Sequence, residues 1–373
     1  ENGGYMKKNF LVSAYTFYNV GDDLFIQILC ERYPAVHFYI VAPKDYKKIF
    51  NIQKNLHIIP SDNFFYRIIN KIITLIDPKN SLFIELSRFM DAIIIIGGSM
   101  FIENSDWQKR FEISNKKFFK KKDKFIIGAN FGPYKTKEFY ETFKEAFYNY
   151  NDICFRDSFS FKLFEDLPIV RKANDIAFTF QNMKSYDKED EISISVINLK
   201  NRDSLSKFYE DYLNQLKNVT SFFINKGITV NLISFCDAEG DLESATYIYN
   251  LLTKLEKQKC NVINYKYNLN EVIKTLQKSR LIIASRFHAM ILGWKFKSVV
   301  IPLIYSDKMI NVINDSKFFG YYKRIEDINE LDIQHIYEEY LKKNIFEVEL
   351  LEIGAQKQFS KLDEYLQEEK SGK

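Results

Sequence analysis

Short runs of Ile, Val, Leu and Phe alternate along the chain with longer segments in which apolar residues recur at helical spacing. This alternation predicts parallel sheets whose strands are joined by crossover helices, which is the α/β class. In the first half we expect strands at Phe10–Tyr15, Val36–Val41, Leu56–Ile59, Ala92–Ile96, Phe125–Ala129 and Asp152–Phe155. In the second half we expect strands at Ile192–Asn198, Thr229–Ser234, Asn261–Ile263, Leu281–Ala284 and Ser298–Leu303.

A polar stretch at Gln181–Glu191 separates the two strand series and is the predicted domain boundary. With 373 residues the chain is too long for one compact core, so two domains are expected. We predict a Rossmann-like domain over residues 6–182, and a second one with C-terminal helices over residues 183–373. They are expected to face each other across a cleft, with ligands beyond the carboxyl ends of the strands. Glu1–Tyr5, which precede Met6, are left out of this fold reasoning.

Composition excludes several classes of protein. Hydrophobic residues at 46% and charged residues at 27% are ordinary for a globular chain, and a net charge of +4 without a basic stripe does not favour nucleic-acid binding. The four cysteines are far apart and lack zinc-ligand spacing, which predicts reduced thiols and no metal site. No apolar run approaches the roughly 20 residues that cross a bilayer, and the N-terminus lacks a signal peptide, so we expect a cytoplasmic protein.

In the first domain, residues suited to ligand binding follow predicted strands. Asn19–Asp23 opens a helix, where Asp22 or Asp23 either caps the helix or accepts a hydrogen bond or proton from a sugar hydroxyl. Gly97–Ser99 lets a ligand approach the backbone and precedes a helix whose free N–H groups favour an anion. Gly128–Pro133 serves the same purpose or simply forms a turn.

Cations follow other strands. Arg156 either binds an anion, pairs with Asp157 or covers apolar surface, and Ser158 is placed to cap the next helix. Arg286 and His288 stand together after an apolar strand, and the alternative for His288 is a packed, structurally hydrogen-bonded imidazole. Lys308 follows the last strand and is either a site cation or a solvated surface lysine.

In their order, strand-end placement and spacing, these pieces resemble the polysaccharide pyruvyl transferase family. The matching positions are Asn19, Gly21, Asp22, Gly97, Gly98, Gly128, Gly132, Pro133, Arg156, Asp157, Ser158, Arg286, His288 and Lys308. Ser99 departs from the family, because a third glycine is common there, and Asn174–Phe178 replaces the familiar Asp-Pro-Ala-Phe. Phe287 stands where the family often has leucine. These departures leave the expected fold intact, but they weaken any detailed inference of the substrate from the family.

The resemblance implies a GT-B-like fold and transfer of the pyruvyl group of phosphoenolpyruvate to a sugar. The product would be a ketal on an exopolysaccharide, a capsule or a lipid-linked precursor, with phosphate released and no cofactor required. The implied donor-binding residues are Arg156, Arg286, His288 and Lys308, with His288 as general acid. The implied acceptor-binding residues are Asn19, Asp22, Gly97 and Gly98, with Asp22 or Asp23 as the base.

Two other functions remain open: a GT-B-like glycosyltransferase that uses a nucleotide sugar, and a noncatalytic sugar-phosphate-binding protein. A lipid-linked acceptor would also bring the protein to the cytoplasmic face of the inner membrane. The amphipathic segment Phe64–Ile76, with Arg67 and Lys71, and the basic segment Lys116–Lys124 fit such a contact. The alternatives are a buried core helix for the first segment and a solvated helix end for the second.

Overall fold

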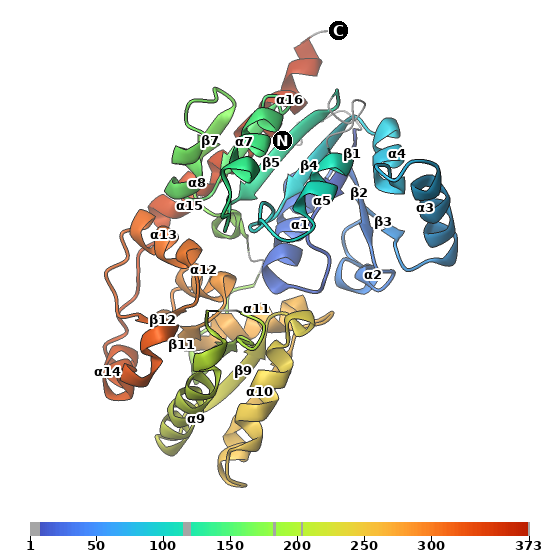
Figure 1. Ribbon diagram of the computed structural model, residues 1–373. Helices are drawn as coiled ribbons and strands as arrows, with labels where there is room; N and C mark the ends of the chain where they lie inside the picture. Colours follow the sequence, from blue (N-terminus) through green and yellow to red (C-terminus); the bar gives the residue numbers. More distant parts are fainter. Residues whose placement is uncertain (1–7, 115–120, 182–183, 203, 372–373) are drawn as a thin grey trace. The chain divides into compact units, whose positions relative to one another are not determined.

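The computed structural model of the chain describes residues 8–114, 121–181, 184–202 and 204–371. The chain folds into two compact units (Figure 1). Unit 1 contains the described residues up to Thr16, then Asp22–Thr179 and the chain from Ile353 onward. Unit 2 contains Phe17–Gly21 and Phe180–Glu352.

Unit 1 is built on a parallel sheet that has seven strands in the described part of the chain. Their order is β3-β2-β1-β4-β5-β6-β7. The strands are β1 (Asn9–Ser13), β2 (His37–Ala42), β3 (Leu56–Pro60), β4 (Ala92–Ile96), β5 (Asp123–Ala129), β6 (Asp152–Phe155) and β7 (Val170–Lys172). The helices between them are α1 (Val20–Arg32), α2 (Tyr46–Ile49), α3 (Phe64–Ile76), α4 (Leu82–Leu86), α5 (Trp107–Ser114), α7 (Lys137–Phe147) and α8 (Ser158–Leu163).

Unit 2 repeats the plan with a six-stranded parallel sheet, counted over the residues that are described, in the order β10-β9-β8-β11-β12-β13. The strands are β8 (Glu189–Val196), β9 (Thr229–Ser234), β10 (Cys260–Asn264), β11 (Ser279–Ala284), β12 (Val299–Ile304) and β13 (Lys323–Arg324). The helices are α9 (Tyr209–Asn225), α10 (Asp241–Asn250), α11 (Leu269–Lys278), α12 (Phe287–Lys295), α13 (Asp307–Asp315) and α14 (Ile333–Lys342). After them come α15 (Glu349–Gln356) and α16 (Ser360–Ser371).

Each sheet has a point where the strand order reverses. In unit 1 the chain runs from β1 outward to β3 and then returns to pair β4 with the other side of β1. In unit 2 the corresponding reversal lies between β8 and β11. Because the crossover helices diverge to opposite faces at such a point, a crevice opens there at the carboxyl ends of the strands. The residues after β1, β4, β8 and β11 are therefore the first place to look for a site.

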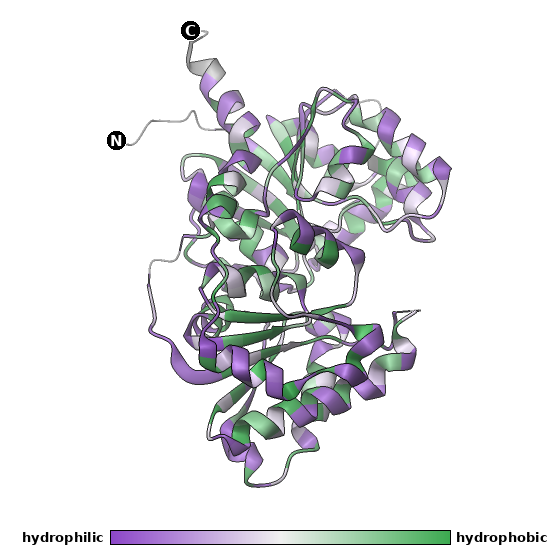
Figure 2. Cartoon of the chain, turned by 90° about the vertical axis from the view of Figure 1, so that its left-hand side faces the viewer, coloured by the Kyte–Doolittle hydropathy of each residue, from purple (hydrophilic) through white to green (hydrophobic). Residues whose placement is uncertain are grey.

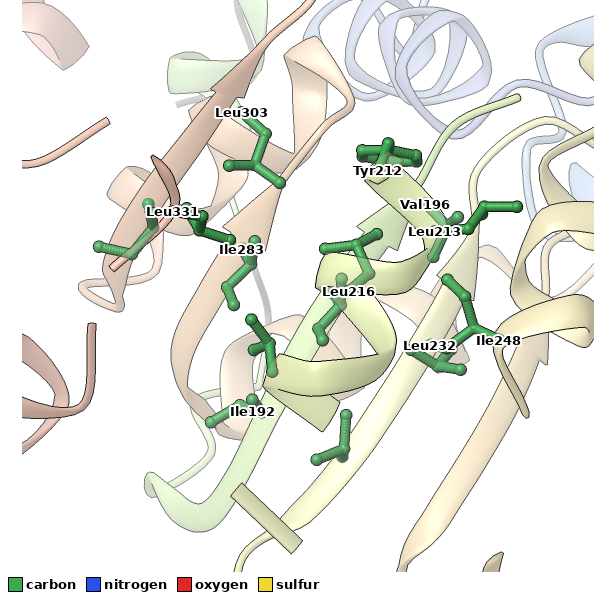
Figure 3. Packing of buried hydrophobic residues seen from close by; sticks show 14 of the residues in the cluster. Ile192, Val196, Tyr212, Leu213, Leu216, Leu232, Ile248, Ile283, Leu303 and Leu331 are labelled. Carbon is green, nitrogen blue, oxygen red and sulfur yellow. The ribbon is translucent and has the colours of Figure 1, made fainter. Parts of the chain in front are cut away.

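The strands are continuously apolar because helices cover the sheets. Ala92, Ile93, Ile94 and Ile96 of β4 are buried, as expected for a central parallel strand. Figure 2 shows strands in mainly hydrophobic colours and helices in mixed colours. Figure 3 shows the core of unit 2, where α9 packs its apolar face onto the sheet. The labelled members of this core are Ile192, Val196, Tyr212, Leu213, Leu216, Leu232, Ile248, Ile283, Leu303 and Leu331.

All the strands predicted from sequence are present, with ends shifted by at most three residues. The prediction missed β7 and β13, which have three and two residues. Both lie at the edge of a sheet, and strands this short carry no readable alternation of apolar and polar residues.

The observed units differ from the predicted domains at the C-terminus. The chain from Ile353 onward, expected with the second domain, belongs to unit 1. Polar anchors hold it there: Arg32 Nη2 lies 2.8 Å from Asp363 Oδ2, and the Gly128 N–H donates to Gln358 Oε1 at 2.9 Å. Phe359 is buried as well. The C-terminal helix α16 therefore completes the packing of unit 1.

The two segments predicted to suit a membrane surface differ in how far their side chains are buried. Within the described helix α3 no side chain is buried, so α3 is not a core helix. Lys116–Lys120 lie outside the described residues. Lys122 donates to the Met90 carbonyl at 2.6 Å, and Lys124 is 1% exposed with Nζ 4.6 Å from the centre of a tyrosine ring, so both turn inward. No helix in the described part of the chain has the length and apolarity needed to cross a membrane.

Candidate active site

The carboxyl ends of four strands in unit 2 bring charged and titratable side chains together. They are Arg202 after β8, Glu239 and Asp241 after β9, Arg286 and His288 after β11, and Tyr305 and Lys308 after β12. Three of the cluster's ion pairs and ring contacts join residues of different strand ends, so the cluster forms only when the sheet does. It surrounds the β8/β11 reversal, where parallel sheets bind ligands.

Arg286 is held by carboxylates from the loop after β9. Its Nε donates to Asp241 Oδ2 at 2.8 Å, its Nη2 donates to Asp241 Oδ1, and its Nη1 lies 2.6 Å from Glu239 Oε2. The Arg286 backbone N–H donates to Ser195 Oγ at 3.1 Å, which fixes the residue before α12. Burial lowers the pKa of Arg286, but Asp241 and Glu239 outweigh it and raise that pKa. The guanidinium is thus permanently charged and firmly oriented.

Glu239 is the carboxylate on which the cations of the cluster converge. Besides Arg286 it meets Arg202, whose Nη2 lies 3.2 Å from Glu239 Oε2. Burial raises the pKa of Glu239, yet Arg286, Arg202 and Lys308 together hold it below its ordinary value. Its side chain stays 32% exposed, so this carboxylate marks an accessible anion position.

Tyr305 carries two cations on its ring. The Arg202 guanidinium lies 4.6 Å and the Lys308 Nζ 5.3 Å from the ring centre. Burial raises the pKa of Tyr305, but Lys308, Arg286 and Arg202 outweigh it and lower that pKa. Lys308 is half-buried, so it is not the solvated surface lysine that the sequence left as an alternative.

His288 lies against the backbone of Gly21. A Cβ added to Gly21 would stand 1.7 Å from His288 Nδ1, and both residues belong to unit 2. The Phe17–Gly21 segment is fixed there by a hydrogen bond from the Val20 N–H to the Phe235 carbonyl at 3.1 Å. Asn19 Oδ1 accepts from the Gly21 N–H at 3.0 Å, so this amide shapes the turn. The sequence pattern at Gly21 therefore reflects the space that the imidazole needs.

Unit 1 forms a separate cluster at its own strand reversal. Asp22, at the start of α1, lies close to Gly97 after β4: a Cβ on Gly97 would stand 3.4 Å from Asp22 Oδ1. Gly97 has a φ of 149°, a conformation that favours glycine. Asp22, Gly97 and Gly98, predicted to act together on an acceptor, are thus neighbours. Asp23 is completely buried, so its predicted contact with a sugar hydroxyl does not fit its position.

Arg156 braces the glycine turn of unit 1. Its Nη1 lies 2.9 Å from Asp175 Oδ2, and its Nη2 donates to Asn130 Oδ1 at 2.8 Å. The guanidinium packs onto Gly98, where an added Cβ would stand 2.3 Å from Nη2. The Asn130 N–H donates to the Gly98 carbonyl at 2.7 Å, so one network holds the turn. Burial raises the pKa of Asp175 although Arg156 opposes it.

Local geometry decides between the interpretations that the sequence left open for residues near Arg156. Arg156 pairs with Asp175, and Asp157 Oδ1 accepts the Ser160 N–H at 2.8 Å as the N-cap of α8. Asp157, and not Ser158, is therefore the cap. Gly128 serves packing, since a Cβ there would stand 2.3 Å from the Cδ1 of an isoleucine.

Sequence reasoning missed several members of these clusters. In unit 1 they are Asn130 and Asp175. In unit 2 they are Arg202, Glu239 and Asp241. Each follows a strand end, which is the available signal, but polar residues follow most strand ends. Their partners are separated from them by up to 103 positions, as with Arg202 and Tyr305, so no local motif links them.

The two clusters offer different chemistry. In unit 2, Arg202, Arg286 and Lys308 outnumber Glu239 and Asp241 by one charge, and an imidazole stands beside them. Such a group suits a small anion and a proton transfer. In unit 1, a carboxylate beside a glycine turn suits a hydroxyl group. Across the described ranges, no group of three or more His, Cys, Asp and Glu has the arrangement of a metal site.

Comparisons with known proteins bear on both the fold and the family. A family model described as "Polysaccharide pyruvyl transferase" matches residues 19–307, which include both clusters except Lys308. The comparison with curated proteins gave no match.

Solved structures share the fold over nearly the whole chain. The S. aureus MnaA–UDP co-structure has a TM-score of 0.60 at 12% identity and covers 97% of each chain. The UDP-GlcNAc 2-epimerase of Neisseria meningitidis bound to UDP-GlcNAc has a TM-score of 0.59 at 12% identity, covering 96% of this chain and 100% of its own. The Methanocaldococcus jannaschii UDP-GlcNAc 2-epimerase in complex with UDP-GlcNAc and UDP has a TM-score of 0.57 at 10% identity, covering 91% and 94%. At these identities the likeness shows the fold alone, a GT-B-like pair of parallel-sheet units.

Proposed function

The chain belongs to the polysaccharide pyruvyl transferase family, and on that premise we propose that it transfers the pyruvyl group of phosphoenolpyruvate to a sugar. The acceptor is a surface polysaccharide, such as an exopolysaccharide or capsule, or its lipid-linked precursor. The products are a pyruvate ketal and inorganic phosphate. The reaction needs no cofactor and takes place in the cytoplasm, where phosphoenolpyruvate is made.

The observation that carries the proposal is the cation cluster at the β8/β11 reversal of unit 2. Phosphoenolpyruvate has a carboxylate and a doubly ionised phosphate, so it needs fixed positive charge. Arg202 and Lys308 supply it beside Tyr305, and each charge-assisted hydrogen bond to the donor contributes about 1.5 to 3 kcal/mol. Arg286 has its charge engaged by Asp241 and Glu239, so its predicted contact with the donor requires Glu239 to give way.

His288 is the general acid of the proposed reaction. It gives a proton to the methylene carbon of the enol, and a sugar hydroxyl oxygen bonds to the adjacent carbon and loses its own proton. The second sugar hydroxyl oxygen then attacks the same carbon as the bond between that carbon and the phosphate oxygen breaks. Its proton passes to the departing phosphate, so the ketal closes and inorganic phosphate is released. The imidazole suits this role because its charge changes near neutral pH.

Unit 1 is the acceptor side in this proposal. Asp22 accepts the proton of a sugar hydroxyl, and Gly97 and Gly98 let the sugar approach the backbone. Arg156 is a positioning residue that holds the glycine turn through Asn130, instead of the donor ligand that the sequence predicted.

Thermal unfolding with added ligand tests the donor. Phosphoenolpyruvate at 100 times its dissociation constant is expected to stabilise the protein by about 2.7 kcal/mol, and UDP-GlcNAc is expected to have no effect. Lys308→Met is expected to abolish the stabilisation. Lys274→Met is the matched control, because Lys274 also lies over a tyrosine ring in unit 2, with Nζ 5.5 Å from the ring centre.

Glu239→Gln removes one negative charge at the accessible anion position and is expected to strengthen the response to phosphoenolpyruvate. Stabilisation by UDP-GlcNAc alone would instead identify a nucleotide-sugar glycosyltransferase. Binding of phosphoenolpyruvate without phosphate release in the presence of cell-wall and lipid-linked acceptors would identify a noncatalytic binding protein.

A further inference from the structure

Helix α3 of unit 1 packs with its less apolar side toward the protein. Its partly buried residues are Tyr66, Asn70, Ile73 and Thr74. Asn70 Oδ1 accepts the Leu82 N–H at 2.8 Å, which ties this side to the start of α4, and the two helices lie beside one another in Figure 1. The side of α3 that faces the protein is thus less apolar than the side that it exposes, the reverse of an ordinary surface helix.

The opposite side of α3 is a continuous apolar surface. Its members are all exposed, from Ile68 at 39% to Ile76 at 81%. At 3.6 residues per turn they occupy one arc of about 140°. They are Phe64, Phe65, Ile68, Ile69, Ile72, Leu75 and Ile76, which we call the α3 face. A chain does not leave such a surface in water without reason, because exposed apolar patches mark interaction sites.

The charges of the helix indicate what covers the α3 face. Arg67 and Lys71 lie on one border of the arc and are exposed, and α3 contains no acidic residue. Two copies of this face packed about a twofold axis would bring the same cations together, which is unfavourable. Apolar side chains bordered on one side by two cations instead match an anionic bilayer, where the acyl boundary meets lipid phosphates.

We propose that α3 binds an anionic membrane surface. The helix lies in the plane of the interface, with the α3 face in the acyl boundary and Arg67 and Lys71 at the phosphates. Its 13 residues are too few to span the bilayer, which takes about 20. The proposal is independent of the reaction proposed above, since it rests on the exposure and charge of one helix.

Vesicle flotation tests the proposal. The full chain is expected to float with vesicles made of equal parts phosphatidylcholine and phosphatidylglycerol, and to float weakly with phosphatidylcholine alone. Arg67→Gln with Lys71→Gln is expected to weaken binding to the mixed vesicles about 30-fold, from about fivefold per cation. Ile68→Gln, Ile72→Gln and Leu75→Gln together are expected to weaken it about 100-fold or more.

A matched control replaces exposed apolar residues elsewhere: Leu255→Gln, Phe319→Gln and Leu350→Gln, at sites 77%, 92% and 82% exposed. This variant is expected to bind mixed vesicles like the wild type. Circular dichroism shows that each variant folds. The proposal fails if the wild type does not float with mixed vesicles at low salt, or if the α3 triple variant and the control float equally. A dimer that the α3 triple variant dissociates, without vesicle binding, would show that a second copy covers the face.

Discussion

Replacing Gly21 with alanine is expected to destabilise the protein through His288. Gly21 is in the first turn of α1 and its backbone is helical, so alanine fits the main chain there. The added Cβ, however, would stand 1.7, 2.3 and 2.4 Å from Nδ1, Cγ and Cε1 of His288. Ordinary van der Waals contact starts at 3.4 Å, so the imidazole must retreat by about 1.7 Å.

The change in stability caused by Gly21→Ala depends on which side chain is present at position 288. Overpacking a buried site costs about 1 to 3 kcal/mol, and a rigid ring displaced this far belongs at the upper end. Alanine gains up to about 1 kcal/mol over glycine in a helix. We therefore expect Gly21→Ala to destabilise the wild type by about 2 kcal/mol. In a His288→Ala background the clash is gone, and the same substitution should stabilise by up to about 1 kcal/mol.

The assay is urea unfolding of the four proteins of this double-mutant cycle. The chain has two tryptophans, so in a Trp107→Phe background Trp294 is the reporter. Trp294 is buried on α12, the helix that begins beside His288, so its fluorescence follows unit 2. Gly227→Ala controls for general destabilisation, because alanine is strained at the φ of 85° there, while its Cβ would meet only a lysine Nζ at 3.8 Å. A Gly21→Ala effect of the same sign and size in both backgrounds would refute the contact.

Two further outcomes follow from buried charges. Gly98→Ala would place a Cβ 2.3 Å from Arg156 Nη2. Because Asp175 and Asn130 fix the guanidinium, we expect calorimetry to show a loss of about 1 to 3 kcal/mol in the free energy of unfolding. An unchanged unfolding temperature would contradict this network. Burial lowers the pKa of Lys188 to about 7. Between pH 7 and about 10.5, the unfolded chain therefore holds a proton on this amine that the folded chain has lost. The free energy of unfolding should rise with pH in that window. Lys188→Met should flatten this rise in urea midpoints, and parallel curves for the two proteins would be inconsistent with a neutral buried amine.

Much of the site could be located from sequence because parallel sheets place ligands at strand ends. Gly97, Arg286, His288 and Lys308 were all found by that rule, and the structure puts the last three in one cluster. The sequence could not show which cations are already engaged. Arg286 with Asp241, and Arg156 with Asp175, are pairs between loops that follow different strands.

The α/β class, the long strands, the two-unit division and the family could all be read from the amino-acid sequence, since each rests on local periodicity or on the order of motifs along the chain. Other features are visible only in the folded chain. The segment from Ile353 onward belongs to unit 1, and Phe17–Gly21 belongs to unit 2, beside His288. Glu239 lies where the cations of the unit 2 cluster meet. The outward apolar face of α3 was also beyond the sequence, because periodicity reveals an amphipathic helix but not which side it turns to the protein. These features depend on which surfaces remain uncovered once the sheets have formed, and on charges that meet only across strand ends.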